Sequence, residues 1–178
     1  MAYIDLPEFD EMDPEIQERA RPIMEKTGTL GEIFKLLAVR KDIYFATDRM
    51  VQSYLLEETE LPYRIKESIA LLVSKENGCS MCVDVHKNIA RMLGMSEDEV
   101  EEVLRGIDAM DVPEREKELL RFCIRASRKD NYKMTQDEID ALKALGYSDT
   151  QIVEAVAITG YFNYINTLSN VFGLGRKE

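Results

Sequence analysis

Residues 63–94 read YRIKESIALLVSKENGCSMCVDVHKNIARMLG, in which two amphipathic segments flank Asn77-Gly78. The first segment carries apolar residues at spacings of three and four, namely Ile65, Ile69, Leu72 and Val73. This spacing is typical of one face of an α-helix. Asn77-Gly78 is a helix stop, because glycine readily adopts the left-handed conformation that closes a helix. The next helix begins at Cys79-Ser80, so a tight turn should fold the two helices back on each other.

The same periodicity recurs along the rest of the chain, and no segment shows a convincing strand-like alternation. The expected helices span residues 14–26, 30–38, 41–58, 62–76, 80–93, 97–106, 113–129, 136–145 and 149–172. Four pairs fit the capping-box spacing: Thr29 with Glu32, Ser96 with Glu99, Thr135 with Glu138, and Ser148 with Gln151. The sequence therefore predicts an all-α bundle, a single domain over residues 13–178 preceded by an N-terminal arm over residues 1–12.

Composition and charge narrow the classes of partner. The 178 residues include 23 Lys and Arg against 34 Asp and Glu, and the resulting net charge of −11 disfavours nucleic acid and anionic lipid. The longest apolar stretch, Ile69 to Val73, is far shorter than a membrane span. The first residues, MAYIDLPEFDEMD, are acidic where a signal peptide is basic and then apolar. We expect a cytoplasmic protein with no nucleic-acid or membrane partner.

Two of the three cysteines and the only histidine fall within eight residues, as Cys79-x-x-Cys82-x-x-x-His86. A helix N-terminus at Cys79 favours a thiolate, and Cys82 lies one turn further on, within reach of a disulfide. His86 shares a helix face with Cys82 and can accept its thiol proton. The same face continues through Ile89, Ala90 and Leu93, so we expect an apolar pocket around the thiol and the imidazole.

Two other interpretations of this cluster stay open. The cysteines and the histidine can be ordinary buried residues of a helix. Alternatively, two thiolates and an imidazole can bind zinc with Cys123 as a remote fourth ligand, although Cys123 lies in an apolar run that is typical of a core. A thioredoxin-like motif needs a βαβ context, which is missing here. The chain also has no Gly-x-Gly-x-x-Gly signature for a nucleotide cofactor.

Residues outside the cluster can also contribute to it. Glu67 or the hydroxyl of Ser74, both in the preceding helix, can approach the thiol and imidazole, and spacing alone does not choose between them. A helical Glu such as Glu67 is more commonly a solvated surface charge. In the last helix Asn163, Asn166 and Asn170 form a polar stripe, expected to be solvated or to form interhelical hydrogen bonds, with a subunit contact or the pocket mouth as the alternative. Tyr161, Phe162 and Tyr164 are expected to pack.

The arrangement of Glu67, eleven residues, Cys79-x-x-Cys82-x-x-x-His86, then Ala90 and Gly94 resembles the AhpD-like alkylhydroperoxidase branch of the carboxymuconolactone decarboxylase superfamily. The stretch GYFNYIN (residues 160–166) also resembles a C-terminal helix pattern of its peroxidase-related members. The resemblance implies an all-α homo-oligomer, a trimer or hexamer, that reduces hydroperoxides through a pair of thiols. Its helical plan would cover roughly residues 30 to 173.

Carried over residue by residue, the resemblance makes Cys82 the peroxidatic thiolate and Cys79 the resolving thiol. His86 would accept the proton and Glu67 would complete the relay. An external dithiol or a reductase protein would restore the pair, and no cofactor or metal is implied.

One departure from the family pattern is Met81, where relatives often carry His or Tyr beside the second cysteine. Met cannot donate a proton, so a protein or small-molecule disulfide reductase is a rival function. A non-catalytic oligomer whose thiols sense oxidant or hold metal is a third hypothesis. Decarboxylation is less expected, because the true decarboxylases are not expected to depend on a cysteine pair.

Overall fold

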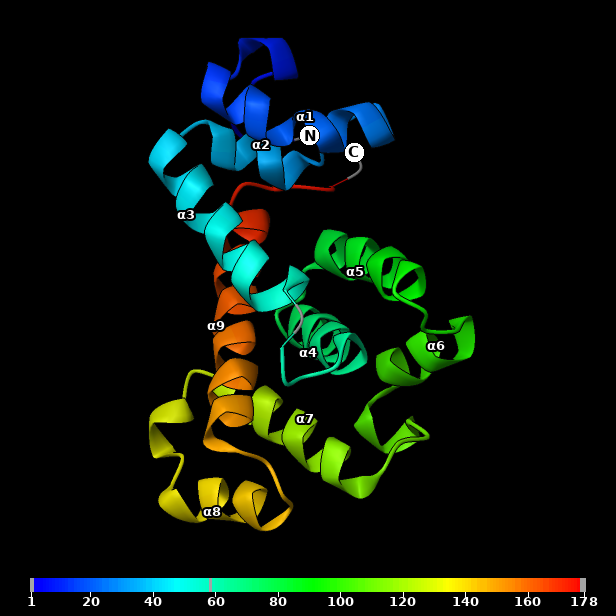
Figure 1. Ribbon diagram of the computed structural model, residues 1–178. Helices are drawn as coiled ribbons and strands as arrows, with labels where there is room; N and C mark the ends of the chain where they lie inside the picture. The colour runs from blue at the N-terminus through cyan, green and yellow to red at the C-terminus, as the bar shows by residue number, and fades with distance from the viewer. Residues whose placement is uncertain (1, 58, 177–178) are drawn as a thin grey trace. The chain divides into compact units, whose positions relative to one another are not determined.

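The computed structural model describes residues 2–57 and 59–176, and over these ranges it is helical with no strand (Figure 1). The helices are α1 (Pro14–Thr27), α2 (Glu32–Ala38), α3 (Lys41–Val51), α4 (Tyr63–Glu76), α5 (Ser80–Met92), α6 (Glu97–Arg105), α7 (Glu114–Ser127), α8 (Gln136–Ala144) and α9 (Asp149–Val171). Short 3-10 turns occupy Phe9–Glu11, Ile107–Ala109 and Asn131–Lys133. The prediction of an all-α protein is confirmed. No helix in the described ranges is long and apolar enough to cross a bilayer.

The chain divides into two compact units, which are described separately. The first unit comprises Met1–Leu56 and Ser169–Glu178, and the second comprises Glu57–Leu168. The expected N-terminal arm lies within the first unit, where Tyr3 N–H donates to the carbonyl of Phe172 at 2.9 Å. The boundary expected at residue 12, between an arm and a single domain, stays a prediction. The cysteine and histidine cluster lies entirely in the second unit.

The helix boundaries follow the sequence signals closely, with two departures, at the end of α3 and at the start of α2. The helix expected over residues 41–58 is an α-helix only as far as Val51, and Gln52–Leu56 continue it as a π-helix. The last position expected in this helix, residue 58, lies outside the described residues. A π-helical turn accommodates extra backbone within a helix, so apolar periodicity alone does not reveal it.

Three of the four expected capping boxes are confirmed, and the first is wrong. In the confirmed boxes the backbone N–H of Ser96, Thr135 and Ser148 each donates to the side chain three residues later. In place of the box expected at Thr29 and Glu32, the N-cap residue of α2 is Gly31, so Glu32 is the first residue of the helix. From there its carboxylate accepts from Gly175 N–H at 2.6 Å instead of reaching back to Thr29. Thr29 and Glu32 have the spacing of a capping box, but the N-cap residue lies two positions after Thr29, so the box does not form.

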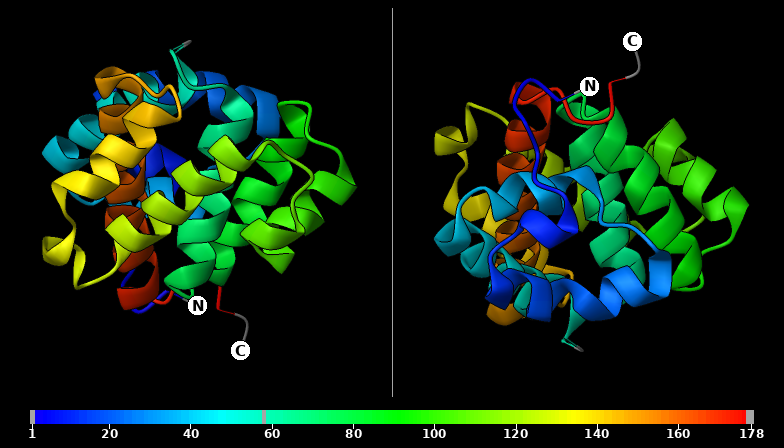
Figure 2. Two further views of the ribbon diagram at one scale, coloured as in Figure 1. Left: turned by 90° about the horizontal axis from the view of Figure 1, so that it is seen from below. Right: turned by 90° about the horizontal axis from the view of Figure 1, so that it is seen from above.

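Helix α4 is the central element of the second unit. Every residue from Ile65 to Ser74 is buried, because α4 packs against α5, α6 and α7 (Figures 1 and 2). A helix surrounded in this way must also bury polar side chains, and each of these needs a partner. Lys66 is paired with Glu154 at 3.1 Å. Its neighbour Glu67 points into the cluster described below.

Candidate functional site

The turn between α4 and α5 places Cys79 at the start of a helix, as the sequence predicts. Gly78 has φ +65°, a left-handed conformation that side chains bearing a Cβ rarely adopt. Cys79 N–H then donates to the carbonyl of Ser74 at 2.9 Å, which closes the end of α4. Cys79 is the N-cap residue of α5, and its Sγ accepts from the N–H of Cys82 at 3.4 Å. A sulfur held against helix N-terminal amides is a favourable position for a thiolate after reduction.

Cys79 and Cys82 are joined by a disulfide, with their Cα atoms 5.3 Å apart. Both residues are buried, with exposed fractions of 1% and 3%. The bond therefore forms between two residues one helical turn apart, inside the packed part of the second unit. This burial shields the sulfur atoms from bulk solvent.

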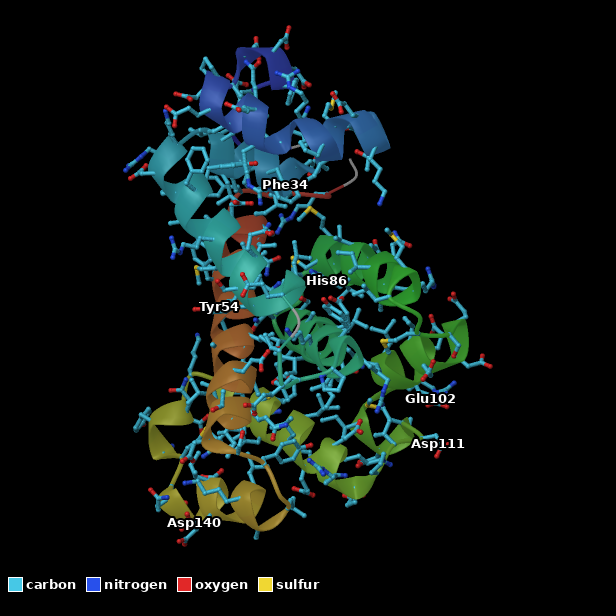
Figure 3. All side chains as sticks on the ribbon, in the orientation of Figure 1. Phe34, Tyr54, His86, Glu102, Asp111 and Asp140 are labelled. Carbon is cyan, nitrogen blue, oxygen red and sulfur yellow. A yellow bond between two sulfur atoms is a disulfide. The ribbon has the colours of Figure 1, made fainter. Side chains whose placement is uncertain are left out.

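His86, on the same helix as Cys82, forms a hydrogen-bonded pair with Glu67 of α4. The distance from His86 Nδ1 to Glu67 Oε2 is 2.7 Å, and the side chains are only 12% and 4% exposed. His86 projects from α5 (Figure 3), and Glu67 comes from α4. A carboxylate oxygen only accepts hydrogen bonds, so Nδ1 is the donor and Nε2 is left as the acceptor nitrogen. Of the two candidates Glu67 and Ser74, the tertiary structure brings Glu67 to the imidazole.

Phe162 of α9 contributes to the site in a way that the sequence did not indicate. Its ring packs edge-on against the His86 imidazole, with ring centroids 4.8 Å apart and an interplanar angle of 85°. Tyr161 packs edge-on against Phe162 in turn. Phe162 is fully buried, so it excludes water from one side of the imidazole and fixes its plane. From the sequence, an aromatic residue in a buried helix is expected to be an ordinary core residue, and no sequence pattern indicates a contact with His86.

The expected apolar lining of the site is only partly present. Ala90 is fully buried, and Ile89 is half-buried. Leu93, in contrast, is 44% exposed, so its expected place in a pocket wall stays a prediction. Leu93 is the C-cap residue of α5, where the chain leaves the helix axis and turns at Gly94. Helical periodicity therefore stops applying one residue earlier than the sequence suggested.

Asn163 and Asn166 of the asparagine stripe in α9 form interhelical hydrogen bonds, one of the outcomes expected for the stripe. Asn77 Nδ2 donates to Asn163 Oδ1 at 2.8 Å and to Asn166 Oδ1 at 3.0 Å. Asn166 Nδ2 donates to the Ser74 hydroxyl at 3.0 Å. The hydroxyl of Ser74 thus accepts from α9, whereas Glu67 is hydrogen-bonded to the imidazole.

The third cysteine does not belong to the site. Cys123 is a free, buried thiol of α7, and burial raises its pKa to about 12. It therefore remains a protonated, unreactive thiol at neutral pH. In the part of the chain that the structure describes, no group of three or more His, Cys, Asp or Glu residues is arranged to hold a metal ion.

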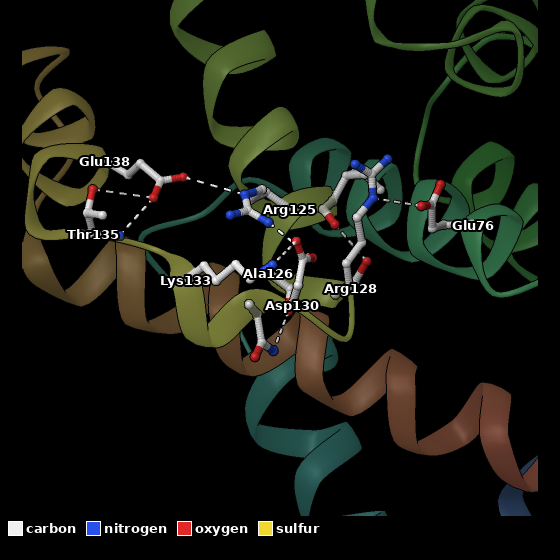
Figure 4. Close-up of polar contacts among 11 residues, drawn as sticks. Glu76, Arg125, Ala126, Arg128, Asp130, Lys133, Thr135 and Glu138 are labelled. Atoms are coloured by element: carbon white, nitrogen blue, oxygen red, sulfur yellow. Dashed lines mark hydrogen bonds and ion pairs between the residues drawn. The ribbon is translucent and has the colours of Figure 1, made fainter.

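A separate cavity of about 760 Å³ lies between α4, α7 and α8 in the second unit. Ion pairs surround it: Arg128 lies 2.8 Å from Glu76, and Arg125 lies 3.1 Å from Asp130 and 3.9 Å from Glu138 (Figure 4). Its lining contains neither cysteine nor histidine. The arginines named here thus have carboxylate partners, and Lys75, which also lines the cavity, donates to the carbonyl of Leu104.

The segment that holds the site matches a known family. Residues 44–121 match the model of the carboxymuconolactone decarboxylase family. This range contains Glu67, Cys79, Cys82 and His86. None of the curated proteins matches this sequence.

Solved structures share the fold over nearly the whole chain. One is the alkylhydroperoxidase AhpD core of an uncharacterised peroxidase-related protein from Ralstonia eutropha JMP134, 24% identical over 99% of this chain and 93% of that chain, with a TM-score of 0.89. An uncharacterised peroxidase-related protein from Silicibacter sp. TM1040 is 24% identical over 97% of this chain and 90% of that one, with a TM-score of 0.88. The debrominase Bmp8 C82A, in complex with 2,3,4-tribromopyrrole, is 18% identical over 99% of this chain and 94% of that chain, with a TM-score of 0.79.

Proposed function

We propose, from the family match over residues 44–121 and the AhpD-like fold, that the chain belongs to the carboxymuconolactone decarboxylase superfamily and that it is a thiol-dependent peroxidase. Cys82 and Cys79 are the redox pair, and His86 with Glu67 is the proton relay. The observation that carries the proposal is the combination of a Cys79–Cys82 disulfide with an imidazole bonded to a buried carboxylate 2.7 Å away. Ordinary core residues have no need of this combination.

The proposed reaction begins on reduced protein. Nε2 of His86, one turn after Cys82 on the same helix face, accepts the thiol proton while Glu67 stabilises the resulting imidazolium. The Cys82 thiolate attacks one oxygen of the hydroperoxide, the O–O bond breaks, and the alkoxide takes the proton from His86 and leaves as an alcohol. Cys82 is now a sulfenic acid. Cys79 attacks its sulfur, so that the disulfide forms and water leaves.

The cycle closes when a second dithiol reduces the disulfide. Both cysteines are buried, and the fully buried Phe162 covers one side of His86. Burial favours a small dithiol over a reductase protein, which would have to bring its own thiol up to buried sulfur atoms. A small dithiol is therefore the first reductant to test.

Substitution of Cys82 by serine tests the proposal directly. We expect Cys82→Ser to reduce the consumption of an alkyl hydroperoxide, in the presence of dithiothreitol, to the background rate. Cys123→Ser is the matched control, since it removes a buried thiol of raised pKa outside the site, and it should keep the wild-type rate. Full hydroperoxide consumption by Cys82→Ser would refute the proposal.

Mass spectrometry after one equivalent of hydroperoxide assigns the two cysteine roles. In Cys79→Ser we expect a sulfenic acid on Cys82 that dimedone traps, because the resolving thiol is gone. The amide contact to Cys79 Sγ supports a thiolate there as well, so the opposite assignment is a definite alternative. A dimedone adduct on Cys79 of the wild-type protein would instead make Cys79 the peroxidatic cysteine and Cys82 the resolving one.

A disulfide reductase is the second candidate, favoured by Met81 between the cysteines and by the N-cap position of Cys79. Its substrate would be a small disulfide, and its assay is the reduction of hydroxyethyl disulfide by the dithiol-reduced protein. Because the debrominase Bmp8 shares this fold, 2,3,4-tribromopyrrole is a third substrate for the same comparison. Turnover of either compound without turnover of hydroperoxides contradicts the peroxidase proposal.

Homo-oligomerisation into a trimer or hexamer is part of the same proposal. Val85 and Met92 on the outer side of α5 are 44% and 75% exposed, and large exposed apolar side chains are common where subunits meet. Light scattering of the purified chain measures the assembly. A monomer at micromolar concentration would overturn this part alone.

A further inference from the structure

The buried residue Asn166 makes two hydrogen bonds to the turn that presents Cys79. Its Oδ1 accepts from Asn77 Nδ2 at 3.0 Å, and its Nδ2 donates to Ser74 Oγ at 3.0 Å. Asn166 and Ser74 are both 0% exposed. A buried amide that uses both its acceptor and its donor in this way is fixed in orientation. The turn is thereby fastened to α9 at two points.

Asn163 strengthens the attachment from the same helix. Its Oδ1 accepts the other hydrogen of the Asn77 amide at 2.8 Å, while its own Nδ2 donates to the carbonyl of Ser127 at 3.1 Å. The Nδ2 group of Asn77 therefore has a partner for each of its two hydrogens. Asn77 is the C-cap residue of α4, two residues before Cys79, so its side chain anchors the turn from within.

The attachment reaches the cysteine through Ser74. The carbonyl of Ser74 accepts from Cys79 N–H at 2.9 Å, and the hydroxyl of the same residue accepts from Asn166. One helical turn before Asn166, Phe162 packs against the His86 ring. Helix α9 therefore contacts both halves of the site, the cysteine turn through Asn166 and the imidazole through Phe162.

We propose that Asn166 is a positioning residue that keeps Cys79 in place to resolve the oxidised Cys82. The proposal rests on the proposed function and adds to it a residue acting on one step. In that step the Cys79 sulfur attacks the sulfur of the Cys82 sulfenic acid, the S–O bond breaks, an S–S bond forms, and water leaves. The formation of the sulfenic acid itself uses Cys82 and His86, to which Asn166 makes no hydrogen bond.

The step-specific test is single-turnover oxidation of reduced Asn166→Ala with one equivalent of alkyl hydroperoxide. We expect sulfenic acid formation within about twofold of wild type and disulfide formation at least tenfold slower. With excess hydroperoxide, the longer-lived sulfenic acid should go on to sulfinic acid on Cys82, seen by mass spectrometry. Thr167→Ala is the matched control, because Thr167 lies on the exposed side of α9 and should behave as wild type in both steps.

A second variant keeps the test decisive if Asn166→Ala fails to fold. Asn77→Ala removes the hydrogen bonds of the turn to Asn163 and Asn166 from a half-buried position and keeps the Asn166–Ser74 bond, and we expect slower disulfide formation with normal sulfenic acid formation. Equilibration of each protein with glutathione adds an independent readout. There the fraction of Cys79–Cys82 disulfide should fall in both variants and stay unchanged in Thr167→Ala.

The outcomes separate this proposal from the proposed function. If wild-type protein forms neither sulfenic acid nor disulfide with hydroperoxide, the peroxidase proposal fails, while the glutathione equilibrium still tests whether Asn166 favours the disulfide. If the wild type reacts and both variants form the disulfide at the wild-type rate, the role of Asn166 is refuted. Equal slowing of both steps also refutes it, since that result indicates a general loss of structure.

Discussion

At the scale of single residues, the buried pair of Glu67 and His86 distinguishes this site from ordinary core packing. Burial of a carboxylate costs free energy unless hydrogen bonds compensate, and the imidazole Nδ1–H supplies one at 2.7 Å. The same bond fixes the tautomer that leaves Nε2 free to accept a proton. In the proposed mechanism, the Glu67 side chain stabilises the imidazolium that forms when His86 accepts a thiol proton.

Glu67→Gln should lower kcat/KM for hydroperoxide by about tenfold to a hundredfold, a loss within the range of general acid–base contributions. Glutamine still accepts from Nδ1–H but carries no charge to stabilise the imidazolium. The measurement is the initial rate of hydroperoxide consumption with a dithiol. Glu76→Gln is the control on the same helix: its pairing with Arg128 is on the surface and should leave the rate unchanged. Equal rates of hydroperoxide consumption for both variants and the wild type would show that Glu67 has no role in the reaction.

At the scale of elements, the α4–α5 turn connects the fold to the chemistry. Asn77 is the C-cap residue of α4, Gly78 takes the left-handed conformation of the turn, and Cys79 is the N-cap residue of α5. The turn must be short, because it places a sulfur at the first amides of α5 and lets α5 pack along α4. Glycine is required for backbone conformation and not for space, since nothing lies within 4 Å of the position that a Cβ would occupy.

Gly78→Ala should therefore lower the free energy of unfolding by about 1–2 kcal/mol, the cost of a left-handed residue with a Cβ. Gly160→Ala is the matched control: it lies in α9, where φ is not left-handed and a Cβ also meets nothing within 4 Å. It should raise stability by up to about 1 kcal/mol, the difference in helix propensity. Urea unfolding of the oxidised proteins gives both values, and a loss of stability equal in the two variants would contradict this account of the turn.

At the scale of the whole molecule, stability comes from helix packing rather than from the disulfide. The Cys79–Cys82 bond closes a loop with a sequence separation of three, which constrains the unfolded chain very little. The extensive burial of α4 is independent of the redox state of two residues at its end. Opening the bond, as the proposed catalytic cycle requires, should therefore leave the fold intact.

Reduction with a phosphine should leave the far-ultraviolet circular dichroism spectrum unchanged. The chain-entropy model gives about 2 kcal/mol for a loop this small, so the midpoint of thermal unfolding should fall by less than about 8 °C. Cys79→Ser/Cys82→Ser should show the same midpoint as the reduced wild type and no response to the phosphine. Loss of helicity on reduction would contradict a pair that cycles between thiol and disulfide.

Much of this architecture was accessible from the sequence. The helices, the stop at Asn77-Gly78 and three capping boxes depend on residues within about four positions of each other, and such interactions leave a regular pattern. The Cys79, Cys82 and His86 cluster is visible for the same reason, since it lies on one helix. Where local geometry changes, the pattern misleads: the N-cap shifts to Gly31, a π-helix follows Val51, and Leu93 turns outward.

The remaining features of the site depend on contacts between residues far apart in the chain. Glu67 and His86 are separated by 19 residues, and Asn77 and Asn166 by 89. Whether a helical Glu is solvated or buried, and whether an Asn stripe faces water or a turn, follows from which helices pack against each other. Local sequence thus specifies the thiol pair and its imidazole. Packing of α4, α5 and α9 decides which carboxylate the imidazole meets and what holds Cys79, because those choices arise only when distant helix faces are brought together.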